Sequence, residues 1–120
     1  MSMSVRKVFL ASFVCYGLAV TFPLPSVAQE SVIEQGRTIA LARAKGNCAV
    51  CHQIPGLDFY GDIAPPLVAM KQRFPDKEKL RAQIYDATQF NPNSVMPPFG
   101  RHDILTPDEL DKVVEWVWSL

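Results

Sequence analysis

The sequence lacks several features that would assign a protein to a class at once. Its 12 basic and 12 acidic residues cancel to a formal net charge of +0, so the charge does not favour nucleic acid as a partner. It contains no β-hairpin pattern and no internal repeat, which leaves an all-α domain of short helices and long loops as the expected fold class. At 120 residues the chain forms at most one domain.

A long hydrophobic run is also missing. The apolar stretch at residues 8–22 is shorter than the about 20 residues that span a membrane. It follows two basic residues and precedes a segment that ends in the small residue Ala28, which is the layout of a secretory signal peptide. We expect residues 1–28 to be a signal peptide and residues 29–120 to be an exported domain. An uncleaved membrane anchor is the alternative.

Cysteine is scarce, with three in the chain. Cys15 lies in the segment that we expect to be removed, and Val14 stands before it where lipoprotein processing would favour a small residue. Cleavage of the leader would leave Cys48 and Cys51. Both belong to one motif, so we expect no ordinary structural disulfide in the mature domain.

Residues 48–52 carry the C-x-x-C-H pattern of covalent c-type haem attachment. Cys48 and Cys51 are spaced to add across the two vinyl groups of one haem, and His52 then lies where it can be an axial ligand of the iron. A redox dithiol would not need His52. A structural zinc site needs four ligands, and only His102 remains as another histidine. We predict one covalent haem c.

The second axial position of the iron has three candidate ligands. Met70 has the helical spacing of a core residue, and His102 lies in a polar loop. Met96 lies in the proline-rich stretch 95–100, whose stiff backbone can hold a thioether at small entropic cost. We favour Met96, because with His52 it would close the iron to oxygen and suit it to electron transfer. An open iron site, as in a ligand sensor or a peroxidase-like enzyme, is the alternative.

Capping signals mark four helices along the chain. Two segments carry a capping box, 31–34 and 106–109, and proline or aspartate begins the other two. The mixed charges of residues 71–81 predict a solvated helix face. The expected helices run from Ser31 to Lys45 with Gly46 as a left-handed cap, from Pro65 to Phe74, from Asp76 to about Thr88, and from Thr106 to Leu120.

The order of these features resembles class I cytochrome c. The resemblance covers nearly all of the expected mature chain and implies an all-α fold wrapped around one covalent haem. It also implies that the carbonyl of Pro65 accepts a hydrogen bond from the axial histidine, and that Gly36 packs against Trp116. Trp118 has no counterpart in this pattern.

Three stretches, residues 46–53, 61–67 and 93–100, further resemble the SoxX family, the monohaem subunits of bacterial SoxAX sulfur-oxidation cytochromes. The resemblance implies a periplasmic heterodimer with a SoxA-type subunit, acting as an L-cysteine S-thiosulfotransferase that couples thiosulfate oxidatively to a cysteine of the SoxYZ carrier. This chain would carry no catalytic nucleophile. It would accept the electrons and pass them to a soluble cytochrome. A free-standing periplasmic electron shuttle of a respiratory chain is the alternative.

Overall fold

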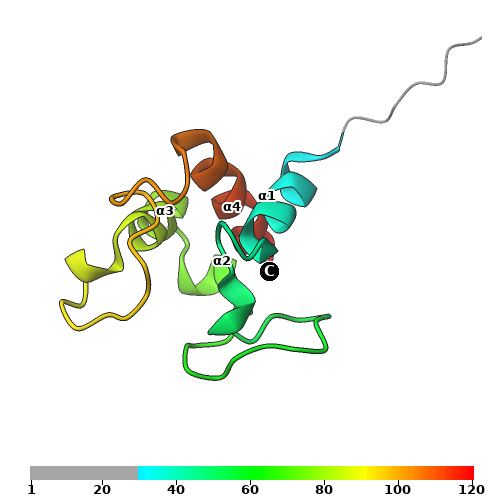
Figure 1. Ribbon diagram of the computed structural model, residues 1–120, viewed down its shortest axis with the longest axis horizontal. Coiled ribbons are helices and arrows are strands. Elements are labelled where there is room, and N and C mark those ends of the chain that lie inside the picture. Colours follow the sequence, from blue (N-terminus) through cyan, green and yellow to red (C-terminus); the bar gives the residue numbers. More distant parts are fainter. Residues whose placement is uncertain (1–29) are drawn as a thin grey trace, which may run out of the picture.

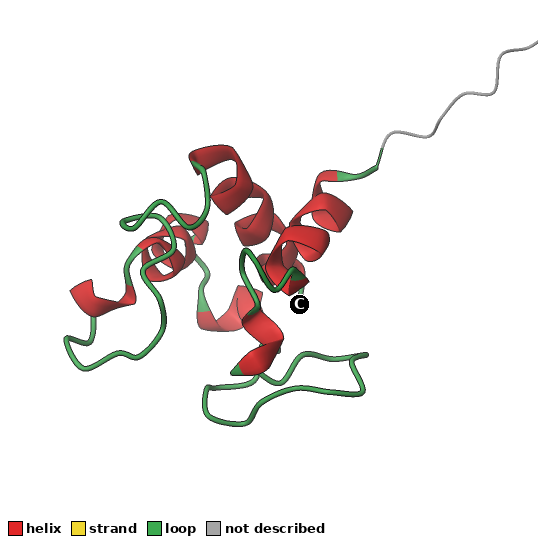
Figure 2. Cartoon of the chain, viewed as in Figure 1, coloured by secondary structure: helices red, strands yellow, loops and turns green. Residues whose placement is uncertain are grey.

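The computed structural model describes residues 30–120, so the expected signal peptide, residues 1–28, lies outside the described residues. This part of the chain is helical and contains no strand beyond one isolated bridge (Figures 1 and 2). None of its helices is long and apolar enough to cross a membrane. The helices are α1 (Val32–Leu41), the 3-10 helix η1 (Cys48–Val50), α2 (Met70–Arg73), α3 (Lys77–Tyr85), the 3-10 helix η2 (Ala87–Gln89) and α4 (Pro107–Ser119). The predicted all-α fold class is confirmed.

The C-terminal helix α4 begins with the predicted capping box. The side chain of Thr106 accepts from the backbone N–H of Glu109 at 3.3 Å, and the Glu109 carboxylate accepts from the Thr106 N–H at 2.9 Å. Pro107 fills the first helical position, where no N–H is needed. The buried face of the helix consists of Leu110, Val113, Val114, Trp116 and Val117.

The first helix α1 starts as predicted but ends earlier. The Ser31 hydroxyl accepts from the Glu34 N–H at 3.2 Å, which caps the helix. The helix ends at Leu41 instead of Lys45. The residues that follow form tight turns on the helix end, where the N–H groups of Lys45 and residue 47 both bond to the carbonyl of Ala42.

Gly46 is not the left-handed cap that the sequence predicts. Its N–H folds back to the Ile39 carbonyl at 3.1 Å, and a Cβ on Gly46 would lie 2.7 Å from the Cα of Ala40. The glycine is therefore needed for a close approach of two backbone segments. The left-handed residue is Asn47, with φ 48°, directly before the C-x-x-C-H motif.

The helix α2 is shorter than predicted and begins at Met70. The preceding segment is not helical. It is tied to the motif region, with the Leu67 N–H donating to the Gln53 carbonyl at 2.8 Å. Ala69 then turns the chain with φ 52°. A hydrogen bond between segments, which periodicity does not encode, overrides the local helix signal.

The helix α3 begins at the predicted cap and ends before the predicted residue. Asp76 accepts from the Glu78 N–H at 3.0 Å. The helix ends at Tyr85, because Asp86 turns away and caps the separate helix η2 by accepting from the Thr88 N–H at 3.1 Å.

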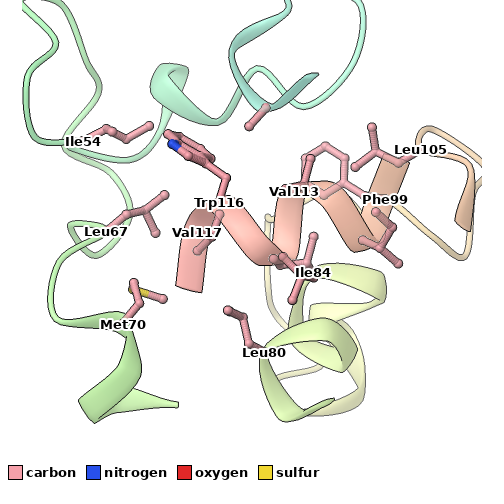
Figure 3. Packing of buried hydrophobic residues seen from close by; sticks show 13 residues of the cluster. Ile54, Leu67, Met70, Leu80, Ile84, Phe99, Leu105, Val113, Trp116 and Val117 are labelled. Atoms are coloured by element: carbon pink, nitrogen blue, oxygen red, sulfur yellow. The ribbon is translucent and has the colours of Figure 1, made fainter. Parts of the chain in front are cut away.

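The helix α4 is the centre of the fold, since it contacts α1, α2 and α3. Its closest approach is to α1 at Gly36, where an added Cβ would lie 2.0 Å from the Lys112 carbonyl oxygen and 3.0 Å from the Cβ of Trp116. The expected packing of Gly36 against Trp116 is confirmed. Figure 3 shows buried side chains from α2, α3 and the loops gathered around α4.

Candidate haem site

The C-x-x-C-H motif forms one turn of 3-10 helix. Asn47 reverses the chain direction, and the N–H groups of Cys51 and His52 both donate to the Cys48 carbonyl, at 3.2 and 2.9 Å. Side chains three residues apart on such a turn lie on the same side. The turn therefore presents both thiols along one edge, and neither is in a disulfide.

The Cys48 thiol does not suit redox chemistry. Burial raises the pKa of the Cys48 thiol to about 11, and the neighbouring Cys51 adds to the rise. A thiol with so high a pKa is protonated at neutral pH and is a weak nucleophile in disulfide exchange. The raised pKa of Cys48 therefore disfavours a redox dithiol.

The His52 ring is oriented by the backbone. Its Nδ1 lies 2.7 Å from the carbonyl oxygen of Pro65. A carbonyl can only accept, so Nδ1–H is the donor and Nε2 keeps a free lone pair for a metal. The segment is aligned by a parallel bridge between His52 and Ala64, with the Ala64 N–H donating to the Cys51 carbonyl at 3.0 Å.

A cavity of about 680 Å³ lies beside this turn. It brings together every residue that the sequence predicts for the site, although they come from three separate segments of the chain. The walls are mainly apolar, as expected for a large flat cofactor. The predicted site residues that line it are Cys48, Cys51, His52, Pro65 and Met96, and its apolar walls include Leu67, Leu80, Ile84, Phe99, Val113 and Val117.

The three candidates for the second axial ligand differ in their surroundings. His102 is exposed and does not line the cavity. Met70 lines it from the core, is 2% exposed, and its Sδ accepts from the Arg73 guanidinium at 3.4 Å. Met96 lines it from the proline-rich loop and is half-buried, with its N–H donating to the Ser94 hydroxyl at 3.3 Å. The described structure thus leaves the two methionines as the candidates.

The described residues offer no alternative metal site of histidine, cysteine and acidic side chains. Among residues 30–120 no group of three or more histidine, cysteine or acidic side chains could hold a metal ion. The four ligands of a structural zinc site are therefore not brought together here.

Sequence reasoning missed two contributors to the site. Gly61 presses against the motif, since an added Cβ would lie 2.1 Å from the Val50 carbonyl oxygen, and its N–H donates to the Ala49 carbonyl at 2.8 Å. Arg73 lines the cavity and donates to the Pro66 carbonyl at 2.6 Å. The available signal for Gly61 was its place inside one of the three SoxX-like stretches. No local sequence pattern marks Arg73 as a site residue.

The basic residues at 71–81 are solvated as predicted at Lys71 and Arg73, which are exposed, whereas Lys77 is half-buried. All three also make contacts within the fold that the sequence pattern does not show. The Nζ atoms of Lys71 and Lys77 lie 4.8 and 4.3 Å from the centre of the Trp118 ring. The indole N–H of Trp118 donates to the Phe74 carbonyl at 3.1 Å. Trp118 thus fastens the segment between α2 and α3 to α4, because cations and an indole face attract each other.

Comparison with known proteins agrees with this geometry. Residues 33–120 match the protein family described as Cytochrome c. The chain belongs to the cytochrome c family. Membership implies covalent haem c, and the cysteine spacing at residues 48–51 is that of its attachment motif. The predicted cofactor and the predicted family are confirmed.

Two known proteins show which cytochromes c this chain is similar to. The crystal structure of SoxXA from P. pantotrophus is similar with a TM-score of 0.64 and 28% identity, covering 72% of this chain and 79% of that chain. An uncharacterized lipoprotein of Aquifex aeolicus (strain VF5) is 34% identical over 74 residues, which is 61% of this chain. The match spans 36% of that lipoprotein's length. The chain is a class I c-type cytochrome that resembles SoxX.

Proposed function

We propose that this chain is the monohaem electron-transfer subunit of a periplasmic SoxAX-type complex. One observation carries the proposal: a chain similar to SoxXA brings its two attachment thiols, its histidine and its loop methionine to one apolar cavity. The proposed complex is a heterodimer with a SoxA-type subunit. It couples thiosulfate oxidatively to a cysteine of the SoxYZ carrier, and the released electrons leave through this chain to a soluble cytochrome.

Each proposed site residue has a defined task. Cys48 and Cys51 would hold haem c by thioethers, and His52 would bind the iron through Nε2. The Pro65 carbonyl oxygen accepts a hydrogen bond from Nδ1–H, with 2.7 Å between the two heavy atoms. This bond fixes the ring orientation and makes the imidazole a more basic metal ligand. Bound haem c supplies a one-electron iron couple.

Met96 is the proposed second axial ligand. A thioether from Met96 would raise the reduction potential of the iron and leave it no open position for oxygen. The loop that carries it is stiffened by the adjoining Pro97 and Pro98, and its buried Phe99, 6% exposed, anchors it in the core. A closed iron in an apolar cavity favours electron transfer over substrate chemistry.

The bond-making chemistry of the proposed complex is assigned to the partner. Attachment of haem uses Cys48 and Cys51, and the only other cysteine in the sequence, Cys15, lies in the proposed leader. Residues 1–28 would direct the chain to the periplasm as a cleaved signal peptide. The mature chain would then hold no free thiol to act as a nucleophile.

Reduction of this haem by thiosulfate tests the function. The mature holoprotein is mixed with thiosulfate, a SoxA-type subunit and a SoxYZ carrier, and each component is omitted in turn. We expect the haem to be reduced only when all components are present, and the visible haem bands monitor this reduction. We also expect the two cytochromes to co-purify. A stable monomer whose haem is reduced equally with and without the SoxA-type subunit would contradict the proposal and support a free-standing shuttle.

The axial ligand is tested by substitution of each methionine. Met96→Ala should abolish the weak far-red absorption band that marks methionine bound to ferric haem. The matched control is Met70→Leu, which keeps the volume of a core side chain and should leave the band. Persistence of the band in Met96→Ala, or its loss in Met70→Leu alone, would refute the assignment.

A further inference from the structure

The loop that carries Met96 is closed at its base by a set of hydrogen bonds. The chain leaves α3 at Tyr85 and Asp86 and returns at Gly100 and Arg101. The N–H groups of Gly100 and Arg101 both donate to the Tyr85 carbonyl, at 3.1 and 3.2 Å, and the Arg101 guanidinium donates to Asp86 Oδ2 at 3.2 Å. The two ends of the loop therefore lie side by side.

Asp86 is an unusual residue to find at this base. Among residues 30–120, Asp86 is the charged residue that is buried, with 2% of its surface exposed. Its Oδ1 accepts from the N–H and the hydroxyl of Thr88, at 3.1 and 2.5 Å, while its Oδ2 faces Arg101. Burying a carboxylate is costly unless such partners satisfy it.

The Asp86 side chain is ionised at neutral pH. The Thr88 hydroxyl, together with its N–H and the Arg101 guanidinium, holds the pKa of the Asp86 carboxyl below its usual value. A cap for η2 alone does not require a charge, since serine or asparagine also caps helices. The charge has its counterpart in Arg101, on the other end of the loop.

The Tyr85 ring at one end of the loop packs closely against Gly100 at the other end. A Cβ on Gly100 would lie 1.9 Å from Cδ2 of the Tyr85 ring. Inside the loop, the bonds of Ser94 and Met96 are local, to Asn91 and to the Ser94 hydroxyl. The tip is open to solvent, with Val95 86% exposed. The base is thus where this loop is joined to α3.

We propose that the Asp86–Arg101 ion pair is a positioning device that holds the Met96 loop closed over the haem cavity and limits how readily Met96 leaves the iron. The proposal rests on the proposed role of Met96 as axial ligand. Asp86 and Arg101 act through the loop and touch neither haem nor substrate. Loosening the base lets the loop explore more conformations, and the bound position of Met96 becomes a smaller fraction of them.

The test uses the mature holoprotein with Asp86→Asn, Arg101→Gln and the double variant. The first readout is the rate at which added imidazole replaces the native ligand of ferric haem. Loss of the far-red band monitors this replacement. We expect each single variant to react about tenfold faster, equivalent to about 1.4 kcal/mol of lost closure. The double variant should be no faster than either single one, since both remove the same interaction.

A second readout does not involve the iron. Amide hydrogen exchange of residues 91–100 should rise in Asp86→Asn and Arg101→Gln relative to wild type, while exchange in α1 and α4 stays unchanged. The matched control is Arg81→Gln, which removes an ion pair of 2.7 Å with Asp111 away from the loop. It should react with imidazole and exchange at the wild-type rate.

The outcomes separate this proposal from the ligand assignment. If Met96→Ala keeps the far-red band, the ligand assignment fails and the positioning role fails with it. If Met96→Ala loses the band while Asp86→Asn and Arg101→Gln match wild type, the ligand assignment stands and the positioning role alone is refuted. If Asp86→Asn fails to mature, Arg101→Gln decides, because Arg101 has a 58% exposed side chain and breaks the pair from outside.

Discussion

Replacement of Gly36 by alanine tests the packing on which the fold depends. Gly36 lies in the middle of α1 at its crossing with α4. The added methyl carbon would lie 2.0 Å from the Lys112 carbonyl oxygen and 2.6 Å from its carbon. These are backbone atoms of a helix and cannot rotate aside, so the two helices must separate.

The expected loss of stability follows from two opposing effects. Overpacking a tight contact costs about 1–3 kcal/mol, and a clash with backbone puts Gly36→Ala near the upper end of that range. Alanine recovers about 1 kcal/mol of helix propensity relative to glycine. The net destabilisation is about 2 kcal/mol, which lowers the unfolding temperature of a domain of this size by about 8–16 °C.

Thermal unfolding of the holoprotein, followed by far-ultraviolet circular dichroism, measures this change. The matched control is Thr38→Ala, an exposed position of the same helix, which gains helix propensity without meeting α4. It should unfold at or slightly above the wild-type temperature. If Gly36→Ala unfolds at as high a temperature as Thr38→Ala, the reasoning is wrong. The helices would then be further apart than the 2.0 Å between an added Cβ and the Lys112 carbonyl oxygen implies.

Two further predictions follow from side chains around α4. The N–H of Thr106 and then the ammonium of Lys45 hold the pKa of Glu109 below its usual value, so ionised Glu109 stabilises the fold above about pH 4 and this contribution is lost as the pH falls through the folded-state pKa. Glu109→Gln should therefore unfold at a lower temperature than wild type at pH 7, with the gap closing in acid; an equal gap at all pH values would contradict this. Trp118→Phe removes the indole donor to Phe74 at 3.1 Å and should cost about 1 kcal/mol in denaturant unfolding; an unchanged midpoint would show that the bond contributes nothing.

Helix starts were predictable because their signals are local. At Thr106 and Asp76 the capping side chain and the N–H that it satisfies lie within three residues, so the sequence pattern alone locates them. Helix boundaries without such a local cap, the start of α2 among them, were predicted less well. The end of α1 depends on the fold-back of Gly46 onto Ala40, and the start of α2 depends on a bond from Leu67 to Gln53.

Basic residues of α2 and α3 show the same division. Their alternation with acidic residues predicted a solvent-facing helix. In the folded chain Lys71 and Lys77 lie over Trp118, and Arg73 lines the cavity. Trp118 is far from both lysines along the chain, and the cavity exists only after folding, so no local pattern could reveal these contacts.

By itself the sequence determined the haem attachment chemistry, because two thiols and an imidazole within residues 48–52 define it without reference to the rest of the chain. It also determined the helical class, through caps and periodicity. Only the tertiary structure decided that Met96 and His52 share one cavity, that His102 lies outside it, and that Asp86 meets Arg101. The physical reason is that attachment depends on covalent neighbours, whereas a second ligand and its support depend on how distant segments pack.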